Sequence, residues 1–261
     1  MELFLRRSTQ SQYIHDNDPL FTTTVNTKNI ERDLLLLENQ LPFYILEKLY
    51  ELVPTTRLQK EHSNFLDLAR QWFKIYDPYR AWSRQEINKR MKLKQGWDRP
   101  NHFIDVIRYI FIPRHFINTG YYDKFDPVIR STTKLQRVWI SFEPVSERSF
   151  LDITFKKVPI LSWLGLYRSR LQIPQAMIDD LSEFILGNLI LFEQYHYPYH
   201  AYISSYVNLI ACLVQKEGDV NLLVESGIVL NKLSTDKELI DLFRTLDNQL
   251  QLDYSCYKDL S

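Results

Sequence analysis

A long apolar stretch interrupted by a proline constrains the fold of this chain more than any other feature of its sequence. Within residues 33–53, aliphatic side chains recur at steps of three and four, the spacing that lines up one face of an α-helix. These residues are Leu34, Leu37, Leu41, Ile45, Leu49 and Leu52. Neighbouring apolar residues widen the stripe, so we expect a helix that is buried at the centre of a helical core.

Pro42 interrupts this helix. Proline has no N–H, and its ring clashes with the carbonyl group four residues earlier, here that of Glu38, so we expect a kink or a split into two helices. Asn39 and Gln40 lie in the turn whose carbonyl groups lose their partners. We predict that their side chains bond these backbone groups and that Asn39→Ala costs roughly 1 to 3 kcal/mol of stability. Contact with a ligand is the alternative.

The composition is that of a folded chain without an overall charge. Of the 261 residues, 45% are apolar and 14% are aromatic, which excludes intrinsic disorder. The 32 basic residues balance the 32 acidic ones, so no global field favours nucleic acid or an anionic membrane. Cys212 and Cys256 are too few for a disulfide scaffold. Neither a secretory signal nor a membrane span of roughly 20 apolar residues is visible, so we expect this chain alone to be soluble and intracellular.

The periodicity predicts one α+β domain over residues 1–261, predominantly α-helical, with a small antiparallel sheet. Apolar residues alternate at 138–142 and 151–155, which predicts a β-hairpin, and 171–173 is a candidate third strand. Helical spacing predicts the surrounding helices, which are expected at 65–76, 102–111, 181–192, 202–213, 220–224 and 239–250. Thr235 and Glu238 have the spacing of a capping box before the last of these.

We find no catalytic or cofactor-binding motif, so no catalytic residue, cofactor or metal is predicted. His196 and His200 are four residues apart, a spacing that can bind zinc, but Pro198 between them disfavours a regular helix. The acidic group Asp179, Asp180 and Glu183 has the chemistry to hold a cation. Its place at a helix start favours capping of backbone N–H groups instead.

The segment 84–100 is the most basic part of the chain. Six basic residues stand against two acidic ones over residues 84–99. We interpret it as a solvated linker or loop, because aromatic side chains are not interleaved with the charges as single-strand binding requires. The alternative is a nuclear-import or phosphate-binding patch.

Several motifs together resemble the plant "domain of unknown function 247" family. The match begins with Asp-Leu-Leu-Leu-Leu-Glu-Asn-Gln-Leu-Pro-Phe-Tyr-Ile-Leu-Glu-Lys-Leu from Asp33. It continues through a strand and "IP…IDD" segment at 168–180, an "FEQ…ISSY" block at 192–206 and a block at 219–231 that resembles the family's "DV…LL…GII.N". The family-hallmark residues are Asp33, Leu37, Glu38, Asn39, Gln40, Leu41, Pro42, Phe43, Asp179, Asp180, Phe192, Glu193, Ser204, Ser205 and Tyr206.

The resemblance implies a longer protein. Family members usually carry an upstream segment with a Gly-Pro-Tyr-His motif and end in a membrane-spanning helix at the plasma membrane. Residues 1–261 carry neither feature, so we expect a fragment of the family domain. An apolar face left uncovered on the 33–53 helix would then drive self-association.

The resemblance also implies an interaction or recognition protein without catalysis, because some grass relatives are implicated in pollen–stigma self-incompatibility. We expect protein partners rather than nucleic acid. Two alternatives remain: an enzyme with a pocket beside the Pro42 kink, and a nuclear or phosphoinositide-binding factor that acts through residues 84–99. Unspent hydrogen bonds on residues 38–40 would favour the enzyme, whereas bonds to neighbouring backbone groups would favour the interaction protein.

Overall fold

The computed structural model describes residues 35–52, 64–66, 68–69, 100–112, 123–124, 129–146, 148–149, 151–161, 166–250 and 254–255. These residues form a mainly helical α+β fold, as predicted. The chain divides into two compact units, one of residues 1–76 with 91–107 and one of residues 77–90 with 108–261. Asp33, Cys256 and the basic segment 84–99 lie outside the described residues.

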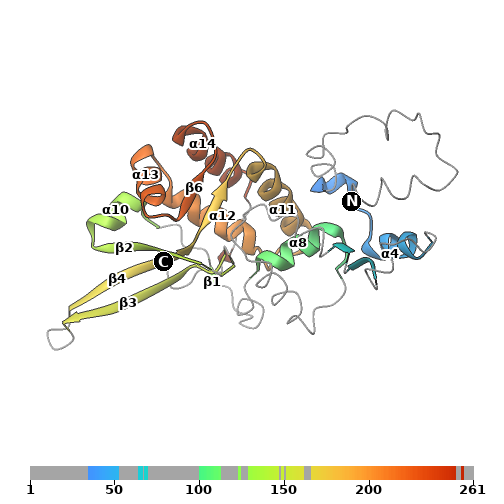
Figure 1. Cartoon of the computed structure of the whole chain (residues 1–261), viewed down its shortest axis with the longest axis horizontal. Helices are drawn as coiled ribbons and strands as arrows, with labels where there is room; N and C mark the ends of the chain where they lie inside the picture. Colours follow the sequence, from blue (N-terminus) through green and yellow to red (C-terminus); the bar gives the residue numbers. More distant parts are fainter. Residues whose placement is uncertain are drawn as a thin grey trace. The chain divides into compact units, whose positions relative to one another are not determined.

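Pro42 splits the first apolar segment in two, as predicted. Leu37–Asn39 form the short 3-10 helix η1, Gln40 is extended, and α4 begins directly after the proline and runs over Phe43–Leu52 (Figure 1). Proline cannot donate the N–H that a continuous helix needs, and its ring clashes with the carbonyl group four residues earlier. The break therefore follows from the local sequence.

The prediction that this segment is buried over most of its circumference is wrong. Leu41, Leu49 and Leu52 are exposed, and in α4 the buried side chains are Phe43 and Tyr50. These two aromatic residues are seven positions apart and therefore share one face. Both contact the Phe65 ring, whose centroid lies 5.3 Å from that of Phe43 and 6.0 Å from that of Tyr50. The split shortens the helix. The buried face of α4 is formed by two aromatic rings rather than by a stripe of leucines.

Gln40 joins the break to the start of α8 (Phe103–Phe111). Its Nε2 donates to the Leu36 carbonyl oxygen at 3.1 Å, and its Oε1 accepts the Ile104 N–H at 3.0 Å. Ile104 lies in the first turn of α8, where N–H groups have no partner within the helix. The prediction that Gln40 bonds freed backbone groups is confirmed. The Asn39 side chain is exposed, so the prediction that its hydrogen bonds are buried is wrong.

We predict that Gln40→Ala lowers the free energy of unfolding by roughly 1 to 3 kcal/mol, because it leaves a carbonyl and a helix N–H without partners. Asn39→Ala is the matched control and should change stability by less than about 0.5 kcal/mol, since its side chain is exposed. Hydrogen exchange at the Ile104 amide measures the effect locally. An exchange rate that does not change in Gln40→Ala would contradict the prediction.

The second unit contains a three-stranded sheet of β2 (Ile140–Val145), β3 (Thr154–Leu161) and β4 (Leu166–Pro174). Its order is β2-β4-β3, with β4 parallel to β2 and antiparallel to β3. The predicted antiparallel sheet, with β2 and β3 as a hairpin, is therefore wrong. β4 takes the centre because Leu171 and Ile173 are nearly fully buried and Gln172 on its other face is also covered, as is typical of a central strand.

The remaining strands of the described residues form two short pairs. β5 (Ala176–Ile178) runs parallel to β6 (Val229–Asn231), and β1 (Asp123–Lys124) pairs antiparallel with β7 (Tyr254–Ser255). Gly227 lies between α13 (Glu217–Glu225) and β6 with a φ of 75°, the left-handed conformation in which glycine commonly ends a helix.

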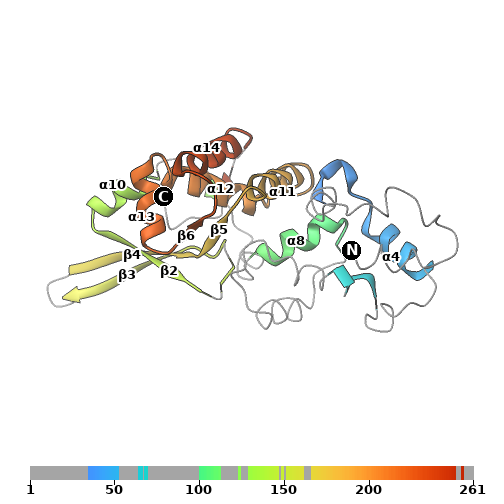
Figure 2. The ribbon, with the colours of Figure 1, turned by 45° about the horizontal axis from the view of Figure 1, so that its top comes forward.

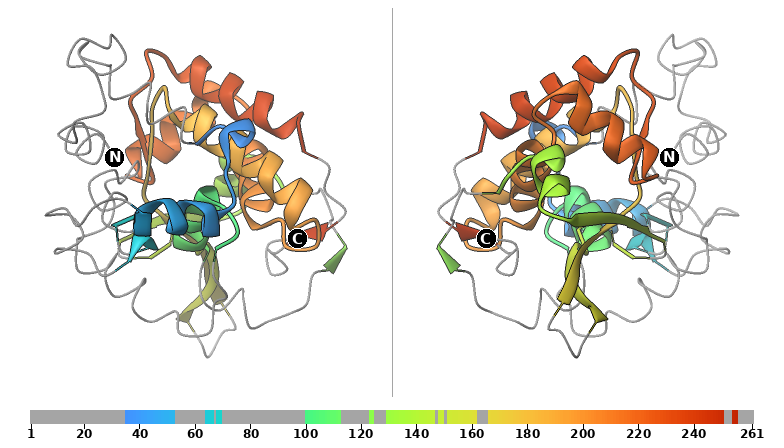
Figure 3. Two further views of the ribbon diagram at one scale, coloured as in Figure 1. Left: turned by 90° about the vertical axis from the view of Figure 1, so that its right-hand side faces the viewer. Right: turned by 90° about the vertical axis from the view of Figure 1, so that its left-hand side faces the viewer.

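The helical core of the second unit is formed by α10 (Thr132–Arg137), α11 (Ser182–His196), α12 (Tyr202–Leu213), α13 and α14 (Asp236–Asp247). α12 contacts both α11 and α14, and the ribbon shows these helices packed together (Figure 3). Most side chains of α12 are buried. The predicted capping box is confirmed at α14, where the Glu238 N–H donates to Thr235 Oγ1. Within the described residues, no helix has both the length and the apolarity to cross a membrane.

Candidate functional site

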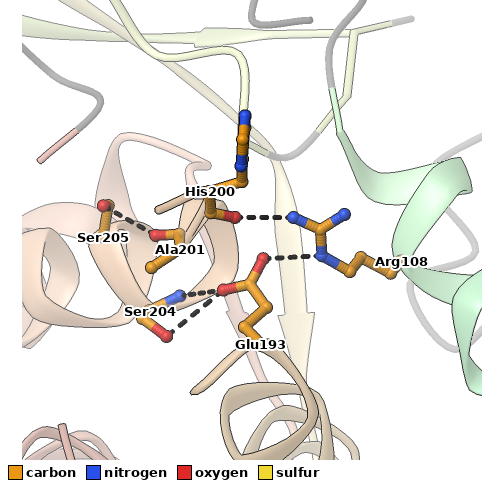
Figure 4. A network of polar contacts seen from close by, with 6 residues as sticks. All are labelled: Arg108, Glu193, His200, Ala201, Ser204 and Ser205. Atoms are coloured by element: carbon orange, nitrogen blue, oxygen red, sulfur yellow. Dashed lines mark hydrogen bonds and ion pairs between the residues drawn. The ribbon is translucent and has the colours of Figure 1, made fainter. Parts of the chain in front are cut away.

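A buried ion pair forms the polar centre of the second unit. Glu193 lies on α11 and is fully buried, and Arg108 on α8 is almost fully buried. Arg108 Nε donates to Glu193 Oε1 at 2.9 Å (Figure 4). Moving two charges out of water costs several kcal/mol per ion, so such a pair persists only where further hydrogen bonds complete it.

The Glu193 carboxylate also caps the start of α12. Its Oε2 accepts the Ser204 N–H at 3.0 Å and the Ser204 hydroxyl at 3.2 Å. The N–H of Ile203 also bonds the carboxylate. The first N–H groups of a helix lack partners within it and carry a partial positive charge, so a carboxylate is stabilised there.

Arg108 is held on its other side by the segment that connects α11 to α12. Its Nη2 donates to the His200 carbonyl oxygen at 2.6 Å. The guanidinium lies 4.1 Å from the centre of the Tyr197 ring and 5.5 Å from that of Tyr202, so two aromatic faces attract it. Arg108 thus joins α8 to the connection at 197–202. Through Glu193, it also joins α8 to α11 and to the start of α12.

This arrangement leaves the Glu193 carboxylate little capacity for proton transfer. Full burial raises its pKa, while the charge of Arg108 and the N–H groups of Ser204 and Ile203 lower it. Both oxygens already accept hydrogen bonds within the protein. A general acid or base must instead reach the group whose proton it moves. We call this cluster, formed by Arg108, Glu193, His200 and Ser204, the clasp.

The pKa of His200 predicts how stability depends on pH. Partial burial and the nearby Arg108 charge lower the pKa of this imidazole below its usual 6.5. Between the folded and the unfolded pKa, the unfolded chain binds more protons, so stability falls as the pH decreases through 6.5. We predict that His200→Asn unfolds with a weaker loss of stability between pH 7.5 and 5.5 than the wild type. Equal pH dependence in urea titrations would contradict this prediction.

The acidic group at the start of α11 acts as a cap, as its position predicts. Asp179 Oδ1 accepts the Leu181 N–H at 3.1 Å and the Ser182 hydroxyl at 3.0 Å, whereas Asp180 is exposed. The His196 ring lies 4.6 Å from that of Phe192. Within the part of the chain that the structure describes, no group of three His, Cys, Asp or Glu residues is placed to hold a metal ion.

The structure brings some hallmark residues together and separates others. Phe192, Glu193, Ser204, Ser205 and Tyr206 gather where α11 meets α12, and the Ser205 hydroxyl bonds the Ala201 carbonyl oxygen. The residues from Leu37 to Phe43 belong to the first unit.

Sequence reasoning missed Arg108. A usable signal exists, because Arg108 and Asp105 are two charged residues in a helix whose other residues are apolar or aromatic, Phe-Ile-Asp-Val-Ile-Arg-Tyr-Ile-Phe, and both are buried. A charge within a helix that is apolar on all sides must be buried and paired.

The fold and this cluster define a helix-rich α+β protein with a buried ion pair at its centre. All 261 residues match the model of DUF247, described as "Plant protein of unknown function", and the chain belongs to this family.

Two Arabidopsis thaliana proteins are similar to it. UPF0481 protein At3g47200 is 27% identical over 258 residues, which cover 89% of this chain and 49% of that protein. Putative UPF0481 protein At3g02645 is 23% identical over 124 residues, which cover 48% of this chain and 22% of that protein. The chain thus spans half or less of the curated relatives it matches. No solved structure matches it.

Proposed function

We propose that this member of the DUF247 family is a non-catalytic interaction protein. The observation that carries the proposal is Trp139, whose side chain is 83% exposed and whose φ is 66°. Tryptophan is usually highly buried, and exposed aromatic residues of this size are enriched where partners bind. The recognition role and the plasma-membrane location implied by the family resemblance are part of this proposal.

The backbone at Trp139 supports the same interpretation. Trp139 follows the last turn of α10, and its N–H donates to the Gln136 carbonyl oxygen. A left-handed residue directly after a helix is usually glycine, because a side chain there is crowded. A bulky residue in this conformation costs about 1 to 3 kcal/mol, and such strained positions cluster at functional sites. The neighbouring Val138 is also exposed, which enlarges the apolar surface.

The hydrogen bonding of Gln40 and Glu193 favours this function over an enzyme whose site lies at the Pro42 break or at the buried ion pair. Both ends of the Gln40 amide bond backbone groups beside the Pro42 break, and both oxygens of Glu193 are engaged in the clasp. A catalytic site would instead hold polar groups with free bonding capacity toward a substrate. The alternative that acts through residues 84–99 concerns a segment outside the described residues.

Affinity purification from plant tissue tests the proposal with two matched variants. Trp139→Gly removes the exposed ring and relieves the backbone, so its thermal stability should equal or exceed that of the wild type. Tyr195→Ala is the control, because Tyr195 on α11 is 75% exposed elsewhere in the same unit. We expect proteins that co-purify with the wild type and with Tyr195→Ala to be lost with Trp139→Gly. Retention of the same proteins by a stable Trp139→Gly variant would contradict the proposal.

A further inference from the structure

One face of the ribbon formed by β3 and β4 is basic. Residues directly opposite one another in a sheet share a face, as do alternate residues along a strand. Lys156 lies opposite Arg170, and Val158 lies opposite Arg168, so these four side chains share one face. The opposite face carries Leu171 and Ile173, which are buried in the core. Gln172 on the basic face is also buried, so this face is covered at that end and is exposed at Lys156 and Arg168.

This face carries more positive charge than its surroundings neutralise. Glu143 on β2 is the acidic residue that contacts it, with Oε2 3.6 Å from Arg170 Nη1 and also accepting the Gln172 amide. At the same end, Arg148 donates to Thr154 Oγ1. No ion pair among the described residues neutralises Lys156 or Arg168. Like charges placed opposite one another destabilise a sheet, so an acidic partner would relieve this repulsion.

β3 also forms an edge of the sheet. In the order β2-β4-β3, no strand of the described residues lies on its outer side, so backbone N–H and carbonyl groups face outward there. β2 pairs with β4 only from Ser169 to Pro174, and beyond that point β3 and β4 continue as a two-stranded ribbon (Figure 2). The regular part of the β3 edge is Thr154–Val158, because the register shifts between Pro159 and Leu161.

The side chains on the β3 edge determine which strands can pair with it, according to the charge of the incoming strand. Lysine, proline and bulges on edge strands hinder pairing with another sheet. The β3 edge carries such residues, namely Lys156, Lys157 and Pro159. Pairing of β3 with a neutral or basic strand, including a second copy of β3, is therefore disfavoured. A strand that carries carboxylates meets no such repulsion. The edge therefore discriminates by charge.

We propose that an extended acidic segment of a partner protein adds to the sheet as a strand beside Thr154–Val158. Its backbone bonds the outer groups of β3, as in other complexes formed by strand addition. Its acidic side chains face Lys156 on one side of the sheet and lie in the positive field of Arg168 and Arg170. This inference rests on the proposed interaction function and names the partner chemistry for a surface in the same unit.

The ribbon fits nucleic acid and lipid less well. Single-stranded nucleic acid needs aromatic rings on the surface that holds its phosphates. Tyr167 is 57% exposed, but it lies opposite Pro159 and thus on the other face from Arg168. An anionic lipid surface would be attracted to the charges but would leave the backbone groups of the β3 edge unused. A peptide strand uses both features.

The test measures binding of a fluorescein-labelled ten-residue peptide that alternates Glu and Thr, by anisotropy in low salt. We expect Lys156→Glu/Arg168→Glu to weaken binding about tenfold or more, because like charges then meet. Lys134→Glu/Lys237→Glu makes the same change in charge on exposed helical residues and should keep wild-type affinity. Circular dichroism confirms that both variants fold.

Four further probes decide between strand addition and simple charge attraction. A peptide of equal charge with alternate backbone amides methylated should bind at least tenfold more weakly, and amides of residues 154–158 should gain protection from hydrogen exchange with the unmodified peptide. Equal binding of the methylated peptide would overturn the proposal. Binding only to phosphatidylserine vesicles or to oligo-deoxythymidine would also overturn it.

The failure of this inference is distinguishable from failure of the interaction function. If Trp139→Gly loses its partners in the affinity purification while Lys156→Glu/Arg168→Glu keeps them and binds no peptide, the interaction function stands and strand addition falls. Loss of the same partners by both variants supports strand addition as the mode of binding.

Discussion

Arg108→Met will lower the free energy of unfolding of the second unit by about 3 to 5 kcal/mol, because it leaves the Glu193 carboxylate buried without its cation. The loss should shrink as the pH is lowered. Without Arg108, burial raises the pKa of Glu193 further, and protonation then removes the unpaired charge. Urea unfolding at pH 7.5 and 5.0, followed by circular dichroism, measures both effects.

The double variant Arg108→Met/Glu193→Met is the control for this prediction. It removes both charges together, so it should unfold with a smaller loss than Arg108→Met alone. Arg108→Lys should fall between them, since a lysine keeps the charge but loses the planar stacking on Tyr197. A double variant less stable than Arg108→Met would show that the buried charges do not depend on each other.

Phe192→Ala will cost a similar amount, about 3 to 5 kcal/mol, because the ring is fully buried and its removal leaves a cavity. The Phe192 ring also contacts Tyr197, the residue that stacks on Arg108 of the clasp. Its centroid lies 5.7 Å from that of Tyr197 in an edge-on contact, and Tyr197 in turn covers the Arg108 guanidinium. We therefore expect the destabilisation of Phe192→Ala to be less than additive with that of Arg108→Met.

The same urea titrations test this second prediction. Phe192→Leu keeps most of the apolar volume and should lose less stability than Phe192→Ala. Leu191→Ala on the exposed side of α11 is the matched control and should lie near the wild type. A loss in Leu191→Ala as large as that in Phe192→Ala would mean that the α11 packing described above is wrong.

The sequence predicts the local features of the fold well. The break at Pro42, the bond from Gln40 to the Leu36 carbonyl, the cap by Asp179 and the capping box before α14 all follow from residues within a few positions of one another. Such features depend on backbone groups that neighbouring side chains can reach, so short-range chemistry determines them.

The sequence predicts long-range pairing poorly. A period of two identifies residues that can form strands, but it does not say which strands pair, so it does not predict that β4 lies between β2 and β3. Arg108 and Glu193 are 85 positions apart, and only the folded chain brings them together. The strained backbone of Trp139 is also hidden from the sequence, because glycine or asparagine is the usual signal for positive φ.

Partner capture by the folded double variant Arg108→Met/Glu193→Met tests the central claim most directly. If the clasp is structural and binding occurs at the exposed surface, this variant should retain the partners of the wild type in affinity purification, whereas Trp139→Gly should lose them. A double variant that is folded by circular dichroism but captures no wild-type partner would contradict the account, because the buried pair would then be part of the functional site.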